Sequence, residues 1–238
     1  MPRFFKEFFE NEPFIEGDDA KHIAKSLRMR VGEALTVCDT KGNDYNCTIS
    51  AVLDGRIELE VNNVVKTVSE PGVEVTLFQC LTKGDKMDLI VRQAVEMGVS
   101  KVVPTFSQNC VSRPDEKQLN KKIERWQRIA DEAAGQSGRG ILPKILDSMT
   151  LTDVAKKLSG FDKCYFFYEL GGESVGKIEP DVKKIAVIIG PEGGFSLAEA
   201  ERFKTAGATV STLGPRILRA ETAPVAAVSL IMHSSNNM

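Results

Sequence analysis

The sequence has few of the features that mark membrane, secreted or metal-binding proteins. It contains no run of 18 apolar residues, so we expect no membrane-spanning helix. Its first ten residues, MPRFFKEFFE, mix charges with phenylalanine and lack the apolar stretch of a secretory signal. The five cysteines are scattered without a CxxC pair, and the two histidines, His22 and His233, are far apart. These absences predict a cytoplasmic protein with reduced thiols and no metal site.

Motifs of nucleotide-binding and hydrolytic enzymes are also absent. Neither GxGxxG nor GxxxxGK followed by Ser or Thr occurs, so the sequence does not support a pyrophosphate cradle. No Ser-His-Asp or Cys-His combination is evident, and no pair of acidic residues is obviously placed for hydrolysis. Any chemistry must therefore come from a bound cosubstrate or from the positioning of reactants.

The composition itself is that of an ordinary globular protein, with 42% apolar and 27% charged residues among 238. A formal net charge of −2 argues against a general nucleic-acid binder. Two stretches are locally basic: residues 21–30 hold four Lys and Arg and no acid, and residues 117–128 hold five with one acid. Each is as consistent with a solvated helix face as with a nucleic-acid contact.

The first 70 residues show the period-2 alternation of short strands. Strands are predicted at residues 34–39, 45–53 and 56–61, the last two joined by an Asp54-Gly55 turn. A helix is predicted in front of them, over residues 18–29. Short antiparallel strands at this spacing favour a small β-barrel. The pattern changes at residues 69–72, where we place a domain boundary.

Beyond this boundary strands alternate with helices. Strands are predicted at residues 74–80, 101–106, 163–168, 185–189 and 209–213, and helices at residues 85–97, 116–134, 151–158, 197–206 and 222–233. This alternation predicts an α/β fold with a mostly parallel sheet covered by helices. Such sheets bind ligands at the carboxyl ends of their strands.

Two of these strands end in a Gly-Pro turn that leads into a helix. The first segment, VIIGPEGGFSLAEAE (187–201), turns at Gly190-Pro191 and then reads Ser-Leu-Ala-Glu, a capping box that starts a helix. The second segment, LGPRILRAETAP (213–224), turns at Gly214-Pro215. Either turn alone is most simply an ordinary tight turn. Side by side at one sheet edge, the two loops would wall a single pocket.

Charged residues inside these tight loops favour a ligand site. They are Glu192, Arg216, Arg219 and Glu221. Glycine lets the backbone approach a ligand closely, and proline stiffens the loop. A ligand with adenine and ribose but no phosphate would suit loops that lack a phosphate cradle. Backbone groups would read the adenine edge, and Leu213, Ile217 and Leu218 would pack on its faces.

Several segments together identify a family. They are HIAKSLRMRVGE (22–33), AVEMGV (94–99), EAAGQSGR (132–139), IGPEGGFSLAEAE (189–201) and LGPRILRAETAP (213–224). In composition, order and spacing the chain resembles the bacterial 16S rRNA (uracil-N3) methyltransferases, members of the knotted SPOUT class. The resemblance covers essentially the whole chain, and the last two segments are its most specific part.

The resemblance implies a fold and a reaction that the residue patterns do not show. Residues 1–70 would form a small PUA-like β-barrel that binds RNA. Residues 71–238 would form a SPOUT-type α/β domain, a trefoil-knotted, mostly parallel sheet with helices on both faces. S-adenosylmethionine (SAM) would lie in the knot, without a metal, and a homodimer would complete the active site. The substrate would be a uridine of 16S rRNA, in the decoding region of the assembled small ribosomal subunit.

Site residues follow by matching motifs to the family. The SAM contacts would be Gly190, Glu192, Gly193, Leu213, Ile217 and Leu218, with Leu170 as a wall of the site. The RNA contacts would be Lys25, Arg28, Arg30 and Arg139. In the reaction, Glu221 would accept the N3 proton and Arg219 would stabilise the uracil anion, or the two would form a structural ion pair. The family often has an Arg-Ser pair where this chain reads Gln108-Asn109-Cys110-Val111, with Arg113 slightly later, so the resemblance does not carry a substrate contact over to this stretch.

Two other readings compete with this one. The chain could be a SPOUT methyltransferase that acts on another RNA, such as tRNA, or it could be a non-catalytic RNA-binding factor in ribosome assembly. The barrel joined to EAAGQSGR argues against the first reading. The intact GPEGG and ILRAETA loops argue against the second.

Overall fold

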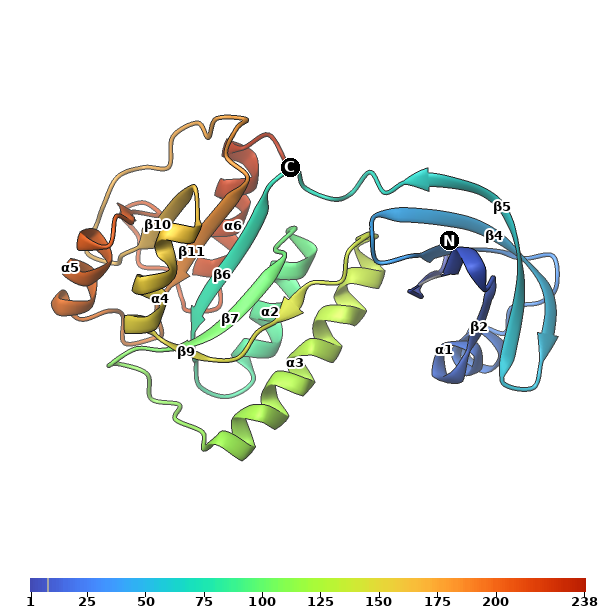
Figure 1. Ribbon diagram of the computed structural model, residues 1–238. Helices are drawn as coiled ribbons and strands as arrows, with labels where there is room; N and C mark the ends of the chain where they lie inside the picture. The colour runs from blue at the N-terminus through green and yellow to red at the C-terminus, as the bar shows by residue number, and fades with distance from the viewer. Residues whose placement is uncertain (8) are drawn as a thin grey trace. The chain divides into compact units, whose positions relative to one another are not determined.

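The computed structural model describes residues 1–7 and 9–238 and divides the chain into two compact units (Figure 1). The first unit consists of Met1–Glu70 together with Ala134–Leu142, and the second of Pro71–Ala133 together with Pro143–Met238. The segment Ala134–Leu142 is therefore grouped with the N-terminal unit, whereas the sequence places it in the second domain.

The first unit is built on a curled five-stranded sheet with the strand order β1-β3-β4-β5-β2. The strands are β1 (Arg3–Phe5), β2 (Phe14–Glu16), β3 (Ala34–Cys38), β4 (Asn43–Leu53) and β5 (Arg56–Lys66). The first pairs parallel to β3, and the remaining neighbours are antiparallel. The predicted strands are confirmed. Alternate residues of β4, Tyr45, Cys47 and Ile49, are buried, as a sheet with one covered face requires.

Helical segments cover the core of this unit. They are η1 (Phe9–Asn11), α1 (Gly17–Lys21) and the π-helix η2 (His22–Ser26), with Phe9, Ala20 and Ile23 buried in the core cluster. The helix predicted over residues 18–29 ends earlier than expected. Arg28 has φ = 54°, a left-handed conformation that cannot continue a right-handed helix.

Arg139 is a structural residue of the first unit. It is 2% exposed, and its guanidinium Nε and Nη2 donate to Glu70 Oε1 and Oε2 at 2.9 and 3.0 Å. The same Glu70 carboxylate accepts the backbone N–H groups of Gly140 and Ile141. The sequence predicts an RNA contact at Arg139, and the structure corrects this, because the side chain is buried and bound to a carboxylate.

The second unit contains a seven-stranded sheet in which every pairing is parallel. The strands are β6 (Glu74–Cys80), β7 (Lys101–Phe106), β8 (Lys144–Ile145), β9 (Met149–Thr150), β10 (Lys163–Phe167), β11 (Lys184–Ile189) and β12 (Thr209–Ser211). Their order is β12-β10-β11-β6-β7-β8, and β9 also pairs with β7. This confirms the predicted parallel sheet.

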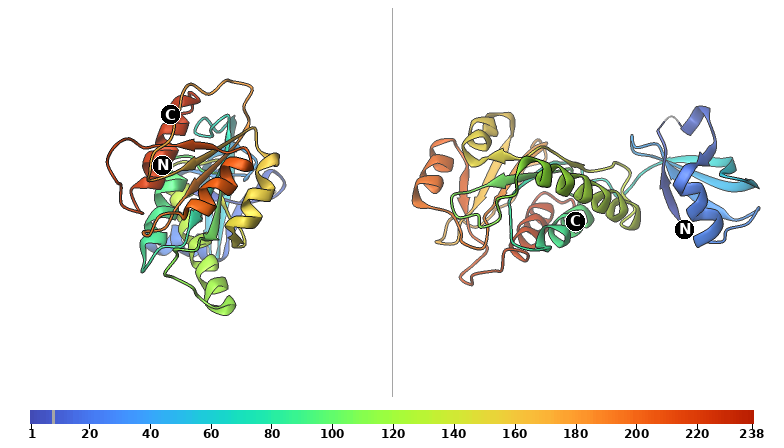
Figure 2. Two further views of the ribbon diagram at one scale, coloured as in Figure 1. Left: turned by 90° about the vertical axis from the view of Figure 1, so that its left-hand side faces the viewer. Right: turned by 90° about the horizontal axis from the view of Figure 1, so that it is seen from below.

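Helices cover both faces of this sheet. They are α2 (Lys86–Glu96), α3 (Glu116–Gln136), α4 (Leu151–Lys157), η3 (Leu158–Gly160), α5 (Leu197–Thr205) and α6 (Ala223–Ser234). Figure 2 shows α2 and α6 on one face and α4 and α5 on the other. Residues 185–189 of β11 are all buried, as expected for a strand covered on both sides. The sheet thus leaves the carboxyl ends of its strands as the place where loops can form a site.

Candidate functional site

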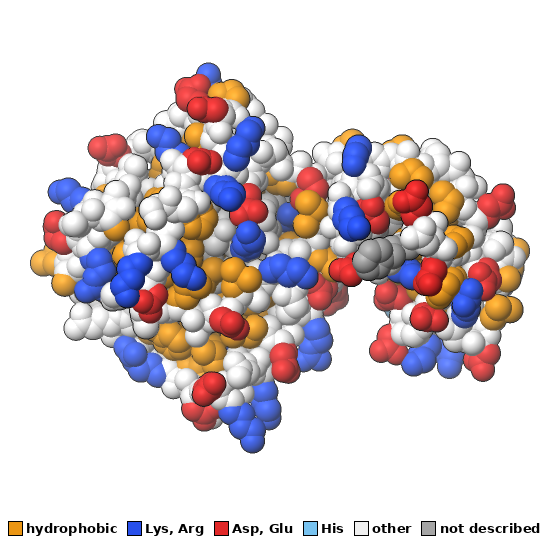
Figure 3. Space-filling view, in the orientation of Figure 1, with side chains coloured by type: hydrophobic (Ala, Val, Ile, Leu, Met, Phe, Trp, Pro, Cys, Tyr) orange, Lys and Arg blue, Asp and Glu red, His pale blue; other side chains and the backbone are white. Residues whose placement is uncertain are grey.

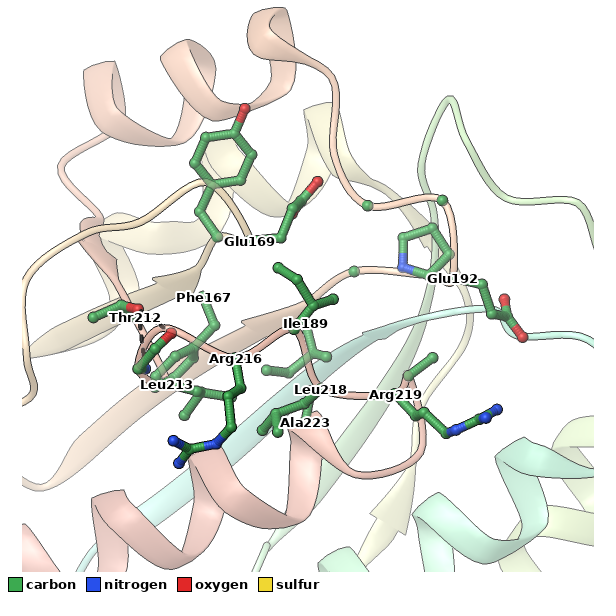
Figure 4. A pocket seen from close by; sticks show the side chains of 18 of the residues that line it. Phe167, Glu169, Ile189, Glu192, Thr212, Leu213, Arg216, Leu218, Arg219 and Ala223 are labelled. Carbon is green, nitrogen blue, oxygen red and sulfur yellow. Dashed lines mark hydrogen bonds between the residues drawn. The ribbon is translucent and has the colours of Figure 1, made fainter.

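The two Gly-Pro loops lie side by side and enclose a cavity of about 570 Å³ at the carboxyl ends of β10, β11 and β12 (Figure 4). The lining comes from these strand ends, both loops and the starts of α2 and α6; it includes Lys86, Phe167, Tyr168, Glu169, Ile189, Gly190, Pro191, Glu192, Gly193, Gly194, Thr212, Leu213, Gly214, Arg216, Ile217, Leu218, Arg219, Ala220 and Ala223. Six of the seven predicted cofactor residues are therefore brought together. The seventh, Leu170, is not in the lining; it is 73% exposed and follows the lining residue Glu169.

The first loop is fixed where it enters α5. Ser196 Oγ accepts the Glu199 N–H at 3.3 Å, and Glu199 Oε2 accepts the Ser196 N–H at 2.8 Å, which confirms the predicted capping box. The other carboxylate oxygen of Glu199, which is 6% exposed, accepts the Gln108 N–H at 2.8 Å. The cap thus also binds the loop that follows β7.

Side chains from neighbouring loops hold the two glycines of GPEGG. Asn109 Nδ2 donates to the carbonyl oxygens of Gly193 and Gly194 at 3.0 and 3.2 Å. Glu169 Oε1 accepts the Phe195 N–H at 2.9 Å. Gly194 has φ = 64°, so a side chain there would strain the backbone, and its Cβ would also force the Glu169 carboxylate to move. Asn109 thus supports the first loop in this chain.

The second loop presents an apolar and a basic side to the cavity. Leu213 and Leu218 are half-buried in the lining, whereas Arg216 and Arg219 are exposed. Within residues 1–7 and 9–238 the Arg219 guanidinium has no hydrogen-bond or ion-pair partner. Arg219 is therefore available to a ligand in the pocket.

Lys86 joins the two loops. Its Nζ lies 3.2 Å from Glu192 Oε1 in the first loop and 3.1 Å from Glu221 Oε2 behind the second. The Glu221 and Glu192 carboxylates beside the ammonium raise the pKa of Lys86. The pKa of Glu221 is lowered, first by its own backbone N–H and then by Lys86. Burial acts to raise the pKa of Glu192, but bonds from its own backbone, the Lys83 N–H and Lys86 outweigh burial and lower it.

This arrangement bears on the predicted catalytic pair. Arg219 lines the pocket, but Glu221 is not among the lining residues. The structural ion pair considered for Glu221 is made with Lys86 rather than with Arg219. Sequence reasoning missed Lys86 because it precedes both loops by more than 100 positions, and no motif connects them.

The other predicted RNA contacts belong to the first unit. Lys25, Arg28 and Arg30 are all exposed, and the Arg30 backbone N–H donates to Glu33 Oε2 at 2.7 Å. Figure 3 shows lysine and arginine side chains spread over the visible face of both units, interspersed with acidic ones. The sign of the surface therefore changes over short distances.

Neither a metal site nor a membrane span is found in the described part of the chain. Among residues 1–7 and 9–238, no three His, Cys, Asp or Glu side chains are grouped so that they could hold a metal ion. No helix in these ranges is long and apolar enough to cross a membrane.

Comparison with known proteins places the chain in a family. Residues 69–232 match the model of the RNA methyltransferase domain, and residues 15–62 match that of the RNA methyltransferase PUA domain. The ribosomal RNA small subunit methyltransferase E of Bacillus subtilis is 32% identical over 250 residues, which cover 99% of this chain and 97% of that protein. The chain belongs to this methyltransferase family. The Aquifex aeolicus member is 34% identical over 81% of this chain and 82% of its own length.

Solved structures of similar proteins agree with this family and hold a ligand. The ribosomal RNA small subunit methyltransferase E of Neisseria gonorrhoeae, bound to SAM, matches with a TM-score of 0.86 and 29% identity, covering 98% of this chain and 97% of that one. A Legionella pneumophila structure with the bound cofactor SAM matches with a TM-score of 0.87 and 25% identity over the same shares.

Proposed function

We propose that this protein transfers the methyl group of SAM to N3 of a uridine in 16S rRNA, in the decoding region of the assembled small ribosomal subunit. The observation that carries the proposal is the pocket formed by the two Gly-Pro loops. Its support is the family membership and the relatives named as small-subunit rRNA methyltransferases. A ribosomal substrate would place the activity in the cytoplasm.

The pocket suits SAM in size and in chemistry. A cavity of about 570 Å³ has the volume of a small-molecule site. Ile189, Leu213 and Leu218 supply apolar faces for an adenine ring, and the glycines of both loops allow close approach of the backbone. The lining lacks a phosphate-binding motif, which agrees with a cosubstrate that carries no phosphate. When bound, SAM would supply an activated methyl group on a sulfonium.

Arg219 is the residue we assign to charge stabilisation. As N3 loses its proton, negative charge develops on the uracil ring, and an unpartnered guanidinium in the pocket lowers the energy of that charge. The role of Glu221 as proton acceptor stays a prediction. Its lowered pKa keeps it ionised, as an acceptor must be, but makes it a weak base. The uridine must also leave its stack for N3 to reach the pocket.

The proposal also includes an RNA-binding first unit, a trefoil knot in the second unit and a homodimer. Lys25, Arg28 and Arg30 of the first unit would contact rRNA phosphates. Exposed apolar side chains of the second unit support a covered surface in a dimer: Leu170, Leu197 and Ile217 are 73%, 72% and 76% exposed. Light scattering of the purified protein tests the dimer, because a monomer at micromolar concentration would contradict it.

The experiment that tests the function is methyl transfer from labelled SAM to small ribosomal subunits that lack the modification, followed by nucleoside mass spectrometry. A 3-methyluridine product in 16S rRNA supports the proposal. Transfer only to tRNA or to another rRNA would favour the first alternative reading. A protein that binds small subunits but not SAM would favour the assembly factor.

A further inference from the structure

The pocket contains a cation to which the proposed reaction gives no role. Lys86 is the first residue of α2 and so belongs to neither Gly-Pro loop. Its ammonium nevertheless contacts one carboxylate associated with each loop, Glu192 at 3.2 Å and Glu221 at 3.1 Å. The three side chains are only 23% to 34% exposed. They form one connected charge network at the pocket wall.

We propose that Lys86 is a positioning residue that holds the two Gly-Pro loops at the separation needed to bind SAM and to present Arg219. The inference rests on the proposed function, because it takes SAM as the ligand. Lys86 acts through the two glutamates and needs no contact of its own with the substrate.

The electrostatics of the network give the reason. Both carboxylate oxygens lie within 3.2 Å of the same nitrogen, so they are separated by no more than twice that distance. Without the ammonium, two like charges would face each other across the gap between the loops and repel. An isolated exposed ion pair contributes little, but a partly buried network of several charges contributes more. Removing Lys86 should therefore move the loops apart.

The position of the network links it to the reaction. Glu221 lies two residues after Arg219 in the same loop, and Figure 4 shows Glu192 and Arg219 on the same side of the pocket. A displaced second loop would carry Arg219 with it. Loss of Lys86 should therefore lower SAM affinity and, at saturating SAM, also the rate of methyl transfer.

The neighbouring Lys83 provides a matched control. It contacts Glu192 through its backbone N–H at 3.1 Å, and its side chain is exposed. Lys83→Met removes one positive charge near the same carboxylate and keeps the backbone bond. Lys86→Arg keeps the charge and can contact both carboxylates, whereas Lys86→Met keeps the length of the side chain and removes the charge.

The test is SAM binding by calorimetry on the full-length variants, with circular dichroism to show that each is folded. Lys86→Met should weaken SAM binding about tenfold at pH 7.5, a coupling typical of groups in direct contact. Lys86→Arg and Lys83→Met should stay within about threefold of the unmodified protein. Combining Lys86→Met with Glu221→Gln should restore part of the lost affinity, because the repulsion disappears. Lowering the pH towards 5 should restore part of it in Lys86→Met, since protonation of one glutamate has the same effect.

Distinct outcomes overturn the inference and the proposed function. If Lys86→Met binds SAM as the unmodified protein does, or if neither Glu221→Gln nor acid restores its affinity, Lys86 does not hold the loops. If the unmodified protein binds SAM but transfers no methyl group to any RNA, the proposed reaction is wrong, while the binding data still decide the role of Lys86. If the unmodified protein does not bind SAM at all, both are overturned.

Discussion

Replacing Glu70 by glutamine should lower the stability of the first unit by more than the loss of one surface charge would. The carboxylate accepts four hydrogen bonds, two from Arg139 and one each from the N–H groups of Gly140 and Ile141. The amide of glutamine would turn a donor toward a guanidinium that has only donors. The positive charge of Arg139, whose side chain is 3% exposed, would stay buried and lose the Glu70 carboxylate as a partner.

The magnitude follows from that burial. Removing one member of a buried ion pair costs about 3–5 kcal/mol, and the 16% exposure of the Glu70 side chain places the expected loss near the lower end, at about 3 kcal/mol. Because about 1.4 kcal/mol corresponds to a factor of ten, unfolding of this unit should become roughly a hundredfold more frequent. Since the chain has two compact units, a signal specific to the first one is needed.

Hydrogen exchange read by mass spectrometry provides that signal. Peptides from β4 should exchange about a hundredfold faster in Glu70→Gln, and peptides from β11 should be unchanged. The control is Glu12→Gln, which removes a 3.4 Å pair with Lys6 on a side chain that is 61% exposed and should cost less than about 1 kcal/mol. Equal exchange of β4 in the two variants would refute the reasoning that the Glu70–Arg139 pair stabilises the first unit.

Four further predictions address the site and the RNA surface. Ser196→Ala removes the capping box of α5 and should lower the free energy of unfolding by about 1 kcal/mol in urea titrations; no change would show that the cap is not needed. Asn109→Ala leaves two loop carbonyls without their donor and should weaken SAM binding several-fold in calorimetry, an effect of about 1 kcal/mol; unaltered affinity would argue against its bracing role. Arg28→Glu with Arg30→Glu should weaken rRNA binding and flatten its salt dependence in filter-binding assays while SAM binding persists, and loss of SAM binding would show that this surface is misassigned. The pKa values of Glu192 and Glu221 are lowered below 4.5 in the folded protein. The stabilisation of the SAM site by these carboxylates should therefore be complete above about pH 5 and be lost as the pH falls through their lowered pKa values. A SAM affinity of the unmodified protein that rises in acid would contradict this.

Local sequence signals predicted most of the second unit. The continuous apolar run of β11 predicts a buried strand, and the Ser-Leu-Ala-Glu capping box predicts where α5 begins. The strands that were missed, such as β1 in the first unit and β8 in the second, are two or three residues long. So few residues carry no measurable periodicity, and their conformation is set by pairing with a neighbouring strand.

The sequence predicted which loops form the site, but it did not predict which charged side chains pair with one another. The Gly-Pro motifs located the pocket, because a glycine and a proline after a strand constrain the local backbone. Arg139 and Lys86 could not be interpreted in the same way. Each is defined by a glutamate that is 69 or more positions away, and only the folded chain brings these side chains together. For this reason Arg139, predicted to contact RNA, is buried against a glutamate, and Lys86, which no motif marks, contacts a carboxylate of each loop.

The strand order of the second unit has a consequence for how the protein is made. β6 lies between β7 and β11, and its partner residues on β11, from Lys184 pairing with Glu74 onward, follow 110 positions later. At a synthesis rate of about 5–20 residues per second, β11 is made on the order of ten seconds after β6, and until then one edge of β6 has no strand to pair with. During that time a strand rich in apolar residues has an open edge, the kind of surface that pairs with other chains. Newly made protein should therefore aggregate more readily when elongation is slowed between β7 and β11, and it should depend on chaperones over this interval more than the finished enzyme does.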